Sequence, residues 1–197
     1  MDAMFQRVEF VRFPYASFDE VFIMVSNPDI LDGVSLAADA IVTNGEFRRW
    51  LIQQTKFSKH AVNAISLSEC QKKNRSPNAK NWWQDYWIVS NECSCKKCDG
   101  RPTDFLCIFK TPDDFRFAIH AKIVSDHSNL TVKMAERYRQ RAECWKGQSN
   151  PPDTIVPHHE ATTMLICRKD YAPKGPGVMT CFDSVLYIED IASKLAI

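Results

Sequence analysis

The sequence has no apolar run that approaches the roughly 20 residues needed by a membrane-spanning helix. It also lacks a strong charge of either sign, because 25 Lys and Arg against 24 Asp and Glu leave a net charge of +1 at pH 7. Internal repeats and low-complexity tracts are absent as well. We therefore expect no membrane partner, and a nucleic-acid site must depend on where the basic residues lie rather than on an excess of them.

The composition is typical of one folded domain. Hydrophobic residues make up 45% and charged residues 25% of the 197 residues, which is ordinary for a globular protein that buries a core. Acidic and basic residues interrupt the apolar stretch 1–13, so we expect no signal peptide and a cytoplasmic location. We expect a single domain over 1–197, mainly helical over 1–68, with most of the strands in 69–197.

Eight cysteines are many for a cytoplasmic protein, but they do not form the pattern of a disulfide framework. Three of them lie close together in the stretch CSCKKC: Cys93, Cys95 and Cys98. This spacing matches half of a structural Zn²⁺ site, whose fourth ligand would have to come from afar, from Cys70, His60 or Cys107. Cys107 alternates with aromatic residues and is better explained by packing. Structural zinc and reduced loop cysteines both stay open, and we favour the second.

The N-terminal half predicts helices. Apolar spacing and turn residues favour helices over 16–26, 32–44 and 44–57. The polar, basic stretch 70–81 contains a proline and predicts a surface loop. The aromatic and β-branched stretch 82–90 predicts a strand.

The C-terminal half alternates strands with a helix. The predicted strands are 103–110, 114–123 and 161–168, the first two joined by the hairpin turn TPDD. A helix is expected over 129–145 with Asn129 or Ser128 as its N-cap, and residues 182–197 predict an extended segment and a short helix. This order predicts an α/β fold with a mixed sheet of four to five strands flanked by helices, in which a helical crossover joins two parallel strands.

The two hairpin strands place unusual residues on one face. In the second strand the apolar residues alternate with a set that includes His120 and Lys122. Pairing in the hairpin brings Asp104, from the first strand, to that same face. An acid, an imidazole and an ammonium on one sheet face can hold a divalent cation beside a phosphate, although solvated charges on an outer sheet face are also common.

The hairpin has Asp104 near the start of one strand and Lys122, two residues after His120, in the next. This arrangement resembles the core of the PD-(D/E)XK nuclease superfamily. The similarity to one bacterial branch continues over about residues 100–195 in four stretches: AIHAKI, MAERYRQRAECW, TTMLICRKDY and FDSVLYIEDIA. The resemblance implies a restriction-endonuclease-like core over 69–197. It also implies Mg²⁺ or Mn²⁺ as the cofactor and DNA as the partner.

Carried over by position, the resemblance implies that Asp104 binds the metal and that Lys122 orients or activates the attacking water. His120 stands where the motif has Glu or Asp, and would be a softer metal ligand that favours Mn²⁺. Met134 stands where the branch usually has Gln. A second acid is expected from the preceding helix, and Glu69 is our first choice.

Two other upstream acids, Asp85 and Glu92, are alternatives to that choice. For contacts with nucleic acid, the basic and aromatic candidates are Lys72, Lys73, Arg75, Arg101 and Trp82. Ordinary solvated charges and core aromatics are the alternative for these residues.

We expect a metal-dependent nuclease that hydrolyses DNA phosphodiester bonds, with a role in defence, mobile-element biology or repair. The main alternative is a nuclease-like domain that has lost catalysis and binds nucleic acid or a protein partner. A zinc-stabilised interaction domain is a third hypothesis. The sequence does not decide between a monomer and a homodimer.

Overall fold

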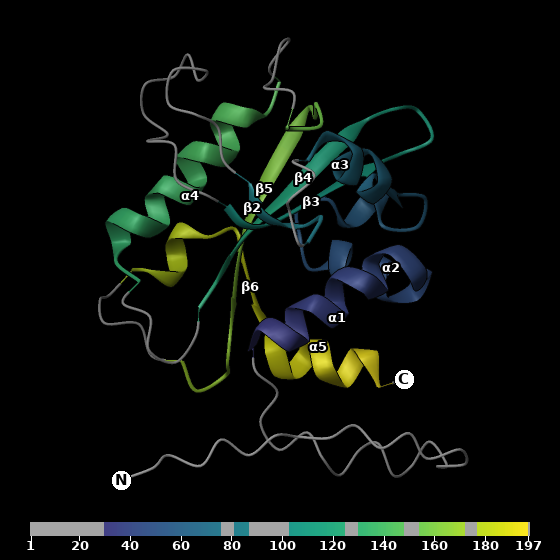
Figure 1. Cartoon of the computed structure of the whole chain (residues 1–197). Helices are drawn as coiled ribbons and strands as arrows, with labels where there is room; N and C mark the ends of the chain where they lie inside the picture. Colours follow the sequence, from purple (N-terminus) through teal and green to yellow (C-terminus); the bar gives the residue numbers. More distant parts are fainter. Residues whose placement is uncertain are drawn as a thin grey trace, which may run out of the picture.

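The structure is a computed structural model that describes residues 30–75, 81–86, 103–124, 130–147, 154–171 and 177–196. These residues form an α/β fold in which helices lie on both faces of a mixed sheet (Figure 1). The helices are α1 (Ile30–Thr43), α2 (Gly45–Gln53), α3 (Ser68–Asn74), α4 (Val132–Trp145) and α5 (Ile188–Leu195). The strands are β1 (Ile65–Ser66), β2 (Gln84–Tyr86), β3 (Thr103–Lys110), β4 (Arg116–Ile123), β5 (Glu160–Cys167) and β6 (Ser184–Tyr187).

The sheet runs in the order β1-β3-β4-β5-β6, and β2 also pairs with β3. β3 and β4 form the predicted antiparallel hairpin, whereas β4, β5 and β6 are parallel neighbours. The predicted α/β class and mixed sheet are confirmed. The path of five strands agrees with the predicted four to five, and β2 is a further short strand beside β1 on the outer edge of β3.

The two faces of the sheet have different cores. Phe105, Cys107 and Phe109 of β3 pack with α1, α2 and α5 on one face. Leu106 and Ile108 pack on the other face with residues of α4. The alternation predicted for the hairpin strands is therefore confirmed, and so is the packing role of Cys107. α4 covers the face on which the candidate site lies.

Most predicted helices are present. The helices expected over 32–44 and 44–57 correspond to α1 and α2, and the Asn44 side chain caps α2 by accepting hydrogen bonds from two backbone N–H groups. The helix expected over 16–26 lies outside the described residues. None of the helices in the described part of the chain is long and apolar enough to span a membrane.

The predicted loop over 70–81 is wrong in its first part, because residues up to Asn74 belong to α3. The buried side chain of Gln71 holds this helix against the sheet: its Nε2 donates to the backbone oxygen of Leu106 and its Oε1 accepts from the backbone N–H of Ile108. These bonds give hydrogen-bond partners to backbone groups of β3 that lie between its part paired with β1 and its part paired with β2. Tertiary hydrogen bonds therefore override a sequence that is too polar to be recognised as a packed helix.

The start of α4 also differs from the prediction. Thr131 is the N-cap, and its side-chain oxygen accepts a hydrogen bond from the backbone N–H of Met134 at 3.3 Å. The predicted caps, Ser128 and Asn129, lie outside the described residues. Threonine caps a helix by the same chemistry, so the choice among neighbouring polar residues depends on where the chain leaves its extended conformation.

Candidate functional site

The candidate site is centred on a contact between β3 and β4. The hairpin pairs Phe105 with Ala121, which places Asp104 opposite Lys122. Lys122 Nζ donates a hydrogen bond to Asp104 Oδ2 at 2.5 Å. The side chains are 19% exposed for Lys122 and 23% for Asp104, so this ion pair is shielded but open to a ligand from solvent. The structure thus brings together two of the four residues predicted for the catalytic site.

Tyr138 of α4 completes the surroundings of the Asp104 carboxylate. Its hydroxyl donates to Asp104 Oδ1 at 2.6 Å, while the backbone N–H of Ile123 donates to Oδ2 at 3.1 Å. Burial and the adjacent Asp104 carboxylate raise the pKa of Tyr138 far above its usual value. The phenol is therefore a neutral hydrogen-bond donor at neutral pH.

A second positively charged side chain, Arg141 of α4, packs against the ring of this tyrosine. The Arg141 guanidinium carbon lies 4.9 Å from the centre of the Tyr138 ring, and Lys122 Nζ lies 5.9 Å from it. Arg141 is 2% exposed and donates to the hydroxyl of Thr103 at 3.1 Å. Positive charge therefore gathers around the Asp104 carboxylate from both the sheet and α4, which favours an anion such as phosphate nearby.

His120 lies on the same sheet face but is enclosed. It is 0% exposed, and its ring centre lies 5.1 Å from that of Trp145 of α4. Neither ring nitrogen has a hydrogen-bond partner, and no hydrogen bond joins it to Asp104 within the described residues. Burial, with smaller contributions from His158 and Arg141, lowers the pKa of His120 well below its usual value. The imidazole is thus neutral at pH 7.

His158 is the second buried histidine, 5.8 Å from His120 between ring centres. Its Nδ1 lies 3.0 Å from the backbone oxygen of Val156. Because a carbonyl oxygen only accepts, Nδ1 carries the proton and Nε2 is left with a lone pair. The neighbouring His159 is exposed.

The predicted second acid, Glu69, is paired with a different residue. It is in the first turn of α3, its side chain is 78% exposed, and it forms an ion pair with Lys72 at 2.6 Å. No hydrogen bond or ion pair joins Glu69 to Asp104 within the described ranges. Glu92 lies outside these ranges, and the side chain of Asp85 is not described.

Potential metal-ligating side chains do not cluster in the described part of the chain. Among the residues that the structure describes, no group of three or more His, Cys, Asp and Glu side chains is placed to hold a metal ion. The zinc candidates Cys93, Cys95 and Cys98 lie outside those residues. Of the two predicted Mg²⁺ or Mn²⁺ ligands, Asp104 and His120, only Asp104 is partly exposed to solvent.

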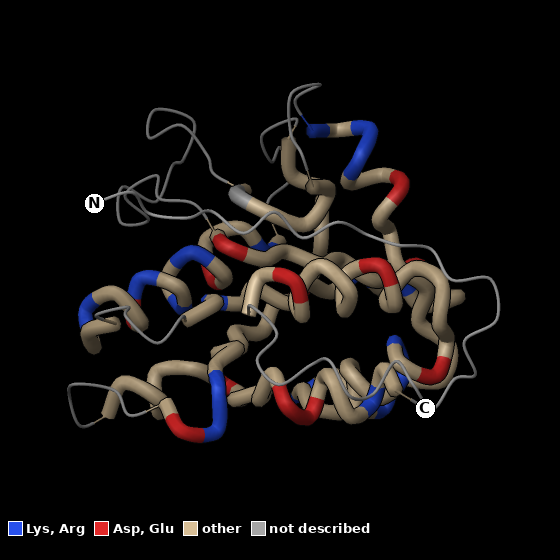
Figure 2. Tube along the Cα trace, turned by 60° about the horizontal axis from the view of Figure 1, so that its bottom comes forward, with Lys and Arg blue, Asp and Glu red and all other residues tan. Residues whose placement is uncertain are grey.

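The basic candidates for nucleic-acid binding differ in how many contacts they make within the protein. Lys72 is paired with Glu69, and Lys73 is exposed. Arg75 donates to the backbone oxygens of Asn81 and Gln84 and lies 4.5 Å above the ring of Tyr86, so it links α3 to β2. Basic and acidic positions are both spread over several elements of the described chain (Figure 2).

The other two candidates add little to a basic surface. Trp82 is half-buried against the core, and Arg101 lies outside the described residues. Of the five candidates, Lys73 is the described cation whose placement best suits a phosphate contact from solvent.

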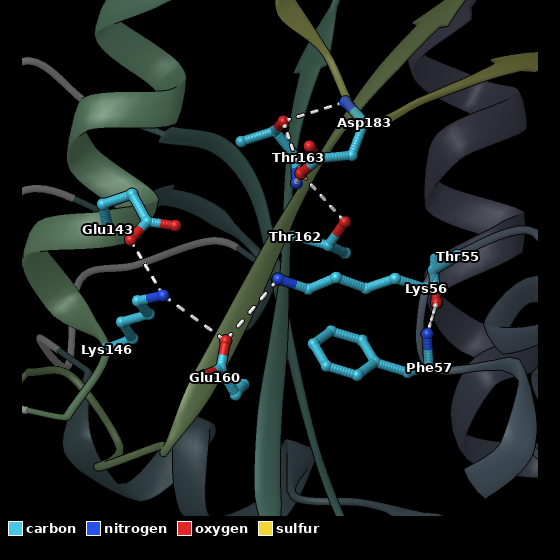
Figure 3. A network of polar contacts seen from close by, with 9 residues as sticks. All are labelled: Thr55, Lys56, Phe57, Glu143, Lys146, Glu160, Thr162, Thr163 and Asp183. Atoms are coloured by element: carbon cyan, nitrogen blue, oxygen red, sulfur yellow. Dashed lines mark hydrogen bonds and ion pairs between the residues drawn. The ribbon is translucent and has the colours of Figure 1, made fainter.

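A separate polar network lies at the opposite end of β5 (Figure 3). The Glu160 carboxylate lies 3.5 Å from Lys56 Nζ and 3.4 Å from Lys146 Nζ, and Lys146 also contacts Glu143 at 2.8 Å. Glu160 pairs with Phe117, whereas Lys122 pairs with Leu165 further along the strand. The exposed charges of this network are a structural link between α4 and the sheet and not part of the candidate site.

No protein-family model matches this chain, and comparisons with curated proteins and with solved structures gave no significant match.

Sequence reasoning missed Tyr138 and Arg141 as neighbours of the Asp104 carboxylate. Tyr138 belongs to the predicted apolar stripe of α4, which suggests packing alone. Arg141 stands three residues later on the same buried side. A tyrosine and an arginine at i, i+3 on the buried face of a helix are the signal that polar groups on the facing strands need partners.

Proposed function

We propose that the Asp104–Lys122 pair is the centre of a phosphodiester-hydrolysing site and that the protein is a metal-dependent nuclease acting on DNA in the cytoplasm. The observation that carries this proposal is the 2.5 Å contact between a carboxylate and an ammonium on adjacent strands. The pair is partly open to solvent and lies beside further positive charge from α4. Such a site attracts the phosphodiester backbone.

In this proposal Asp104 would be the protein ligand of Mg²⁺ or Mn²⁺, and His120 would not. The Asp104 carboxylate supplies the hard oxygen ligand that these ions prefer, and Mg²⁺ commonly uses only one or two carboxylates besides water and phosphate oxygens. His120 is fully enclosed, with no described contact to Asp104. A bound cation neutralises phosphate charge and lowers the pKa of a coordinated water.

The chain's own residues have separate tasks in this proposal. Asp104 would hold the cation. Lys122 turns from Asp104 toward the phosphodiester, where its ammonium orients the attacking water and stabilises the developing negative charge. Arg141, behind Tyr138, raises the positive potential of the site without reaching solvent.

The test is cleavage of plasmid and single-stranded DNA with Mg²⁺ and with Mn²⁺. Wild-type protein is expected to cut, and Lys122→Ala is expected to lose at least about 100-fold in rate. Lys110→Ala is the matched control, since this lysine lies at the other end of β3, pairs with Asp114, and its loss should leave the rate unchanged. Equal cutting by wild type and Lys122→Ala would overturn the nuclease proposal.

A second candidate function, a nuclease-like domain that binds DNA without cutting it, is favoured by the burial of His120. This residue stands where the resemblance implies a metal-binding carboxylate, and its side chain is in the core. On this hypothesis wild type binds DNA in a gel-shift assay but does not cleave it with either metal. Cleavage gained by His120→Glu, with the fold verified by circular dichroism, supports this candidate. Cleavage by wild type rejects it.

A further inference from the structure

Three buried polar side chains on the sheet face covered by α4 have unpaired nitrogens. His120 of β4 is 0% exposed, Trp145 of α4 is 2% exposed, and His158, shortly before β5, is 4% exposed. Both ring nitrogens of His120, Nε1 of Trp145 and Nε2 of His158 make no hydrogen bond to any residue that the structure describes. Burying a polar group without a partner costs free energy, so these nitrogens require an explanation.

His120 is the common neighbour of the other two rings. Its ring centre lies 5.1 Å from that of Trp145 and 5.8 Å from that of His158, and no direct hydrogen bond joins these rings. A water molecule, whose hydrogen bonds are about 2.9 Å long, can bridge polar atoms that are too far apart to bond directly. Two small buried side chains adjoin the rings: Ala118, two residues before His120 on β4, pairs with Ala161 of β5. Alanines at these positions take up little of the space beside the rings.

The unpaired nitrogens include both donors and acceptors. Nδ1 of His158 donates to the backbone oxygen of Val156 at 3.0 Å, so Nε2 of the same ring can only accept. The indole Nε1 of Trp145 can only donate, and the neutral imidazole of His120 has one donor and one acceptor. The indole N–H does not suit a metal ion, and the lone pair of His158 Nε2 does not suit an anion. Water, which donates two hydrogen bonds and accepts two, suits the whole set.

We infer that a buried water molecule binds between His120, His158 and Trp145. The water accepts a hydrogen bond from the Trp145 indole, donates one to His158 Nε2 and has a ring nitrogen of His120 as its third partner. Three partners are typical of a buried water. The water thereby links β4, α4 and the segment before β5. This inference is independent of the proposed nuclease activity, because it concerns the core under α4 and not the Asp104–Lys122 pair.

The experiment measures the ¹⁷O magnetic relaxation dispersion of water in solutions of the full chain, because its amplitude reports the number of long-lived internal waters. His120→Phe and His158→Phe each remove a partner of the water and are each expected to lower the amplitude by about one internal water. His60→Phe is the matched control. It makes the same replacement at a half-buried histidine that packs on Phe115 and Phe117, on the other face of the sheet, and it should leave the amplitude unchanged.

A loss of amplitude in His120→Phe and His158→Phe, but not in His60→Phe, supports the inference. Equal amplitudes in all four proteins overturn it, and so does an equal loss in His60→Phe, because the lost water would then not belong to this site. If circular dichroism shows that His120→Phe and His158→Phe do not fold, a high-resolution crystal structure of the wild-type chain decides. A water within about 3.2 Å of these nitrogens supports the inference, whereas a direct hydrogen bond between the rings, or no water at the nitrogens, overturns it.

Discussion

Gln71 Oε1 accepts a hydrogen bond from the backbone N–H of Ile108 at 2.9 Å. The same amide donates through Nε2 to the backbone oxygen of Leu106 at 3.0 Å and to the Tyr86 hydroxyl at 3.1 Å. One glutamine side chain thus replaces a neighbouring strand at the centre of β3, and α3 is attached to the sheet through it.

Gln71→Ala is expected to lower the free energy of unfolding by about 2–4 kcal/mol, because it leaves a buried N–H and a buried carbonyl without partners. Urea denaturation followed by circular dichroism measures this loss. Lys72→Ala, on the exposed side of the same helix, is the control and should cost less than about 1 kcal/mol. A loss for Gln71→Ala no larger than that of the control would show that the sheet does not depend on this side chain.

A second prediction concerns the contact between α1 and α5. A Cβ atom added at Gly33 would lie 2.6 Å from Cδ1 and 3.1 Å from Cγ1 of Ile188, which is 2% exposed. Gly33→Ala is expected to destabilise the fold by about 1–3 kcal/mol through overpacking, despite the higher helix propensity of alanine.

The double variant Gly33→Ala/Ile188→Val tests this contact, because valine lacks the Cδ1 atom. Its loss of stability should be smaller than the sum of the two single losses, by at least about 0.5 kcal/mol in a double-mutant cycle. Additive losses would mean that the two positions do not meet.

The buried histidines predict sensitivity to acid. The pKa of His120 is lowered by burial, then by His158 and Arg141, and the pKa of His158 is lowered by burial and by His159. The unfolded chain therefore takes up protons near pH 6.5 before the folded one does. The contribution of these two neutral histidines to the free energy of unfolding is fully present above that pH, and it falls as the pH drops below it.

At pH 5.5 this loss reaches at most about 1.4 kcal/mol for each histidine relative to pH 7.5. Urea denaturation at both values should show that His120→Leu loses less stability on acidification than wild type does. Asp183, whose carboxylate accepts from Thr162 and Thr163 and has a lowered pKa, acts only at lower pH. An equal loss in wild type and His120→Leu would exclude His120 as the source.

The sequence by itself determined which side chains lie on each face of the hairpin. Residues alternate between the two sides of a strand, and a short turn sets the register, so Asp104 and Lys122 had to meet once the hairpin formed. The same local rules predicted the helices α1, α2 and α4 and the strands β3, β4 and β5. These features depend on period and on turns, which are readable from neighbouring residues.

Only the tertiary structure decided which side chains complete the site. α3 is a helix because Gln71 meets unpaired backbone groups of β3, 35 and 37 residues away. Tyr138 reaches Asp104 because the crossover helix packs over that sheet face, and the same packing encloses His120 behind Trp145. Contacts between distant segments follow from how the layers pack, and no local pattern encodes the distance between two side chains.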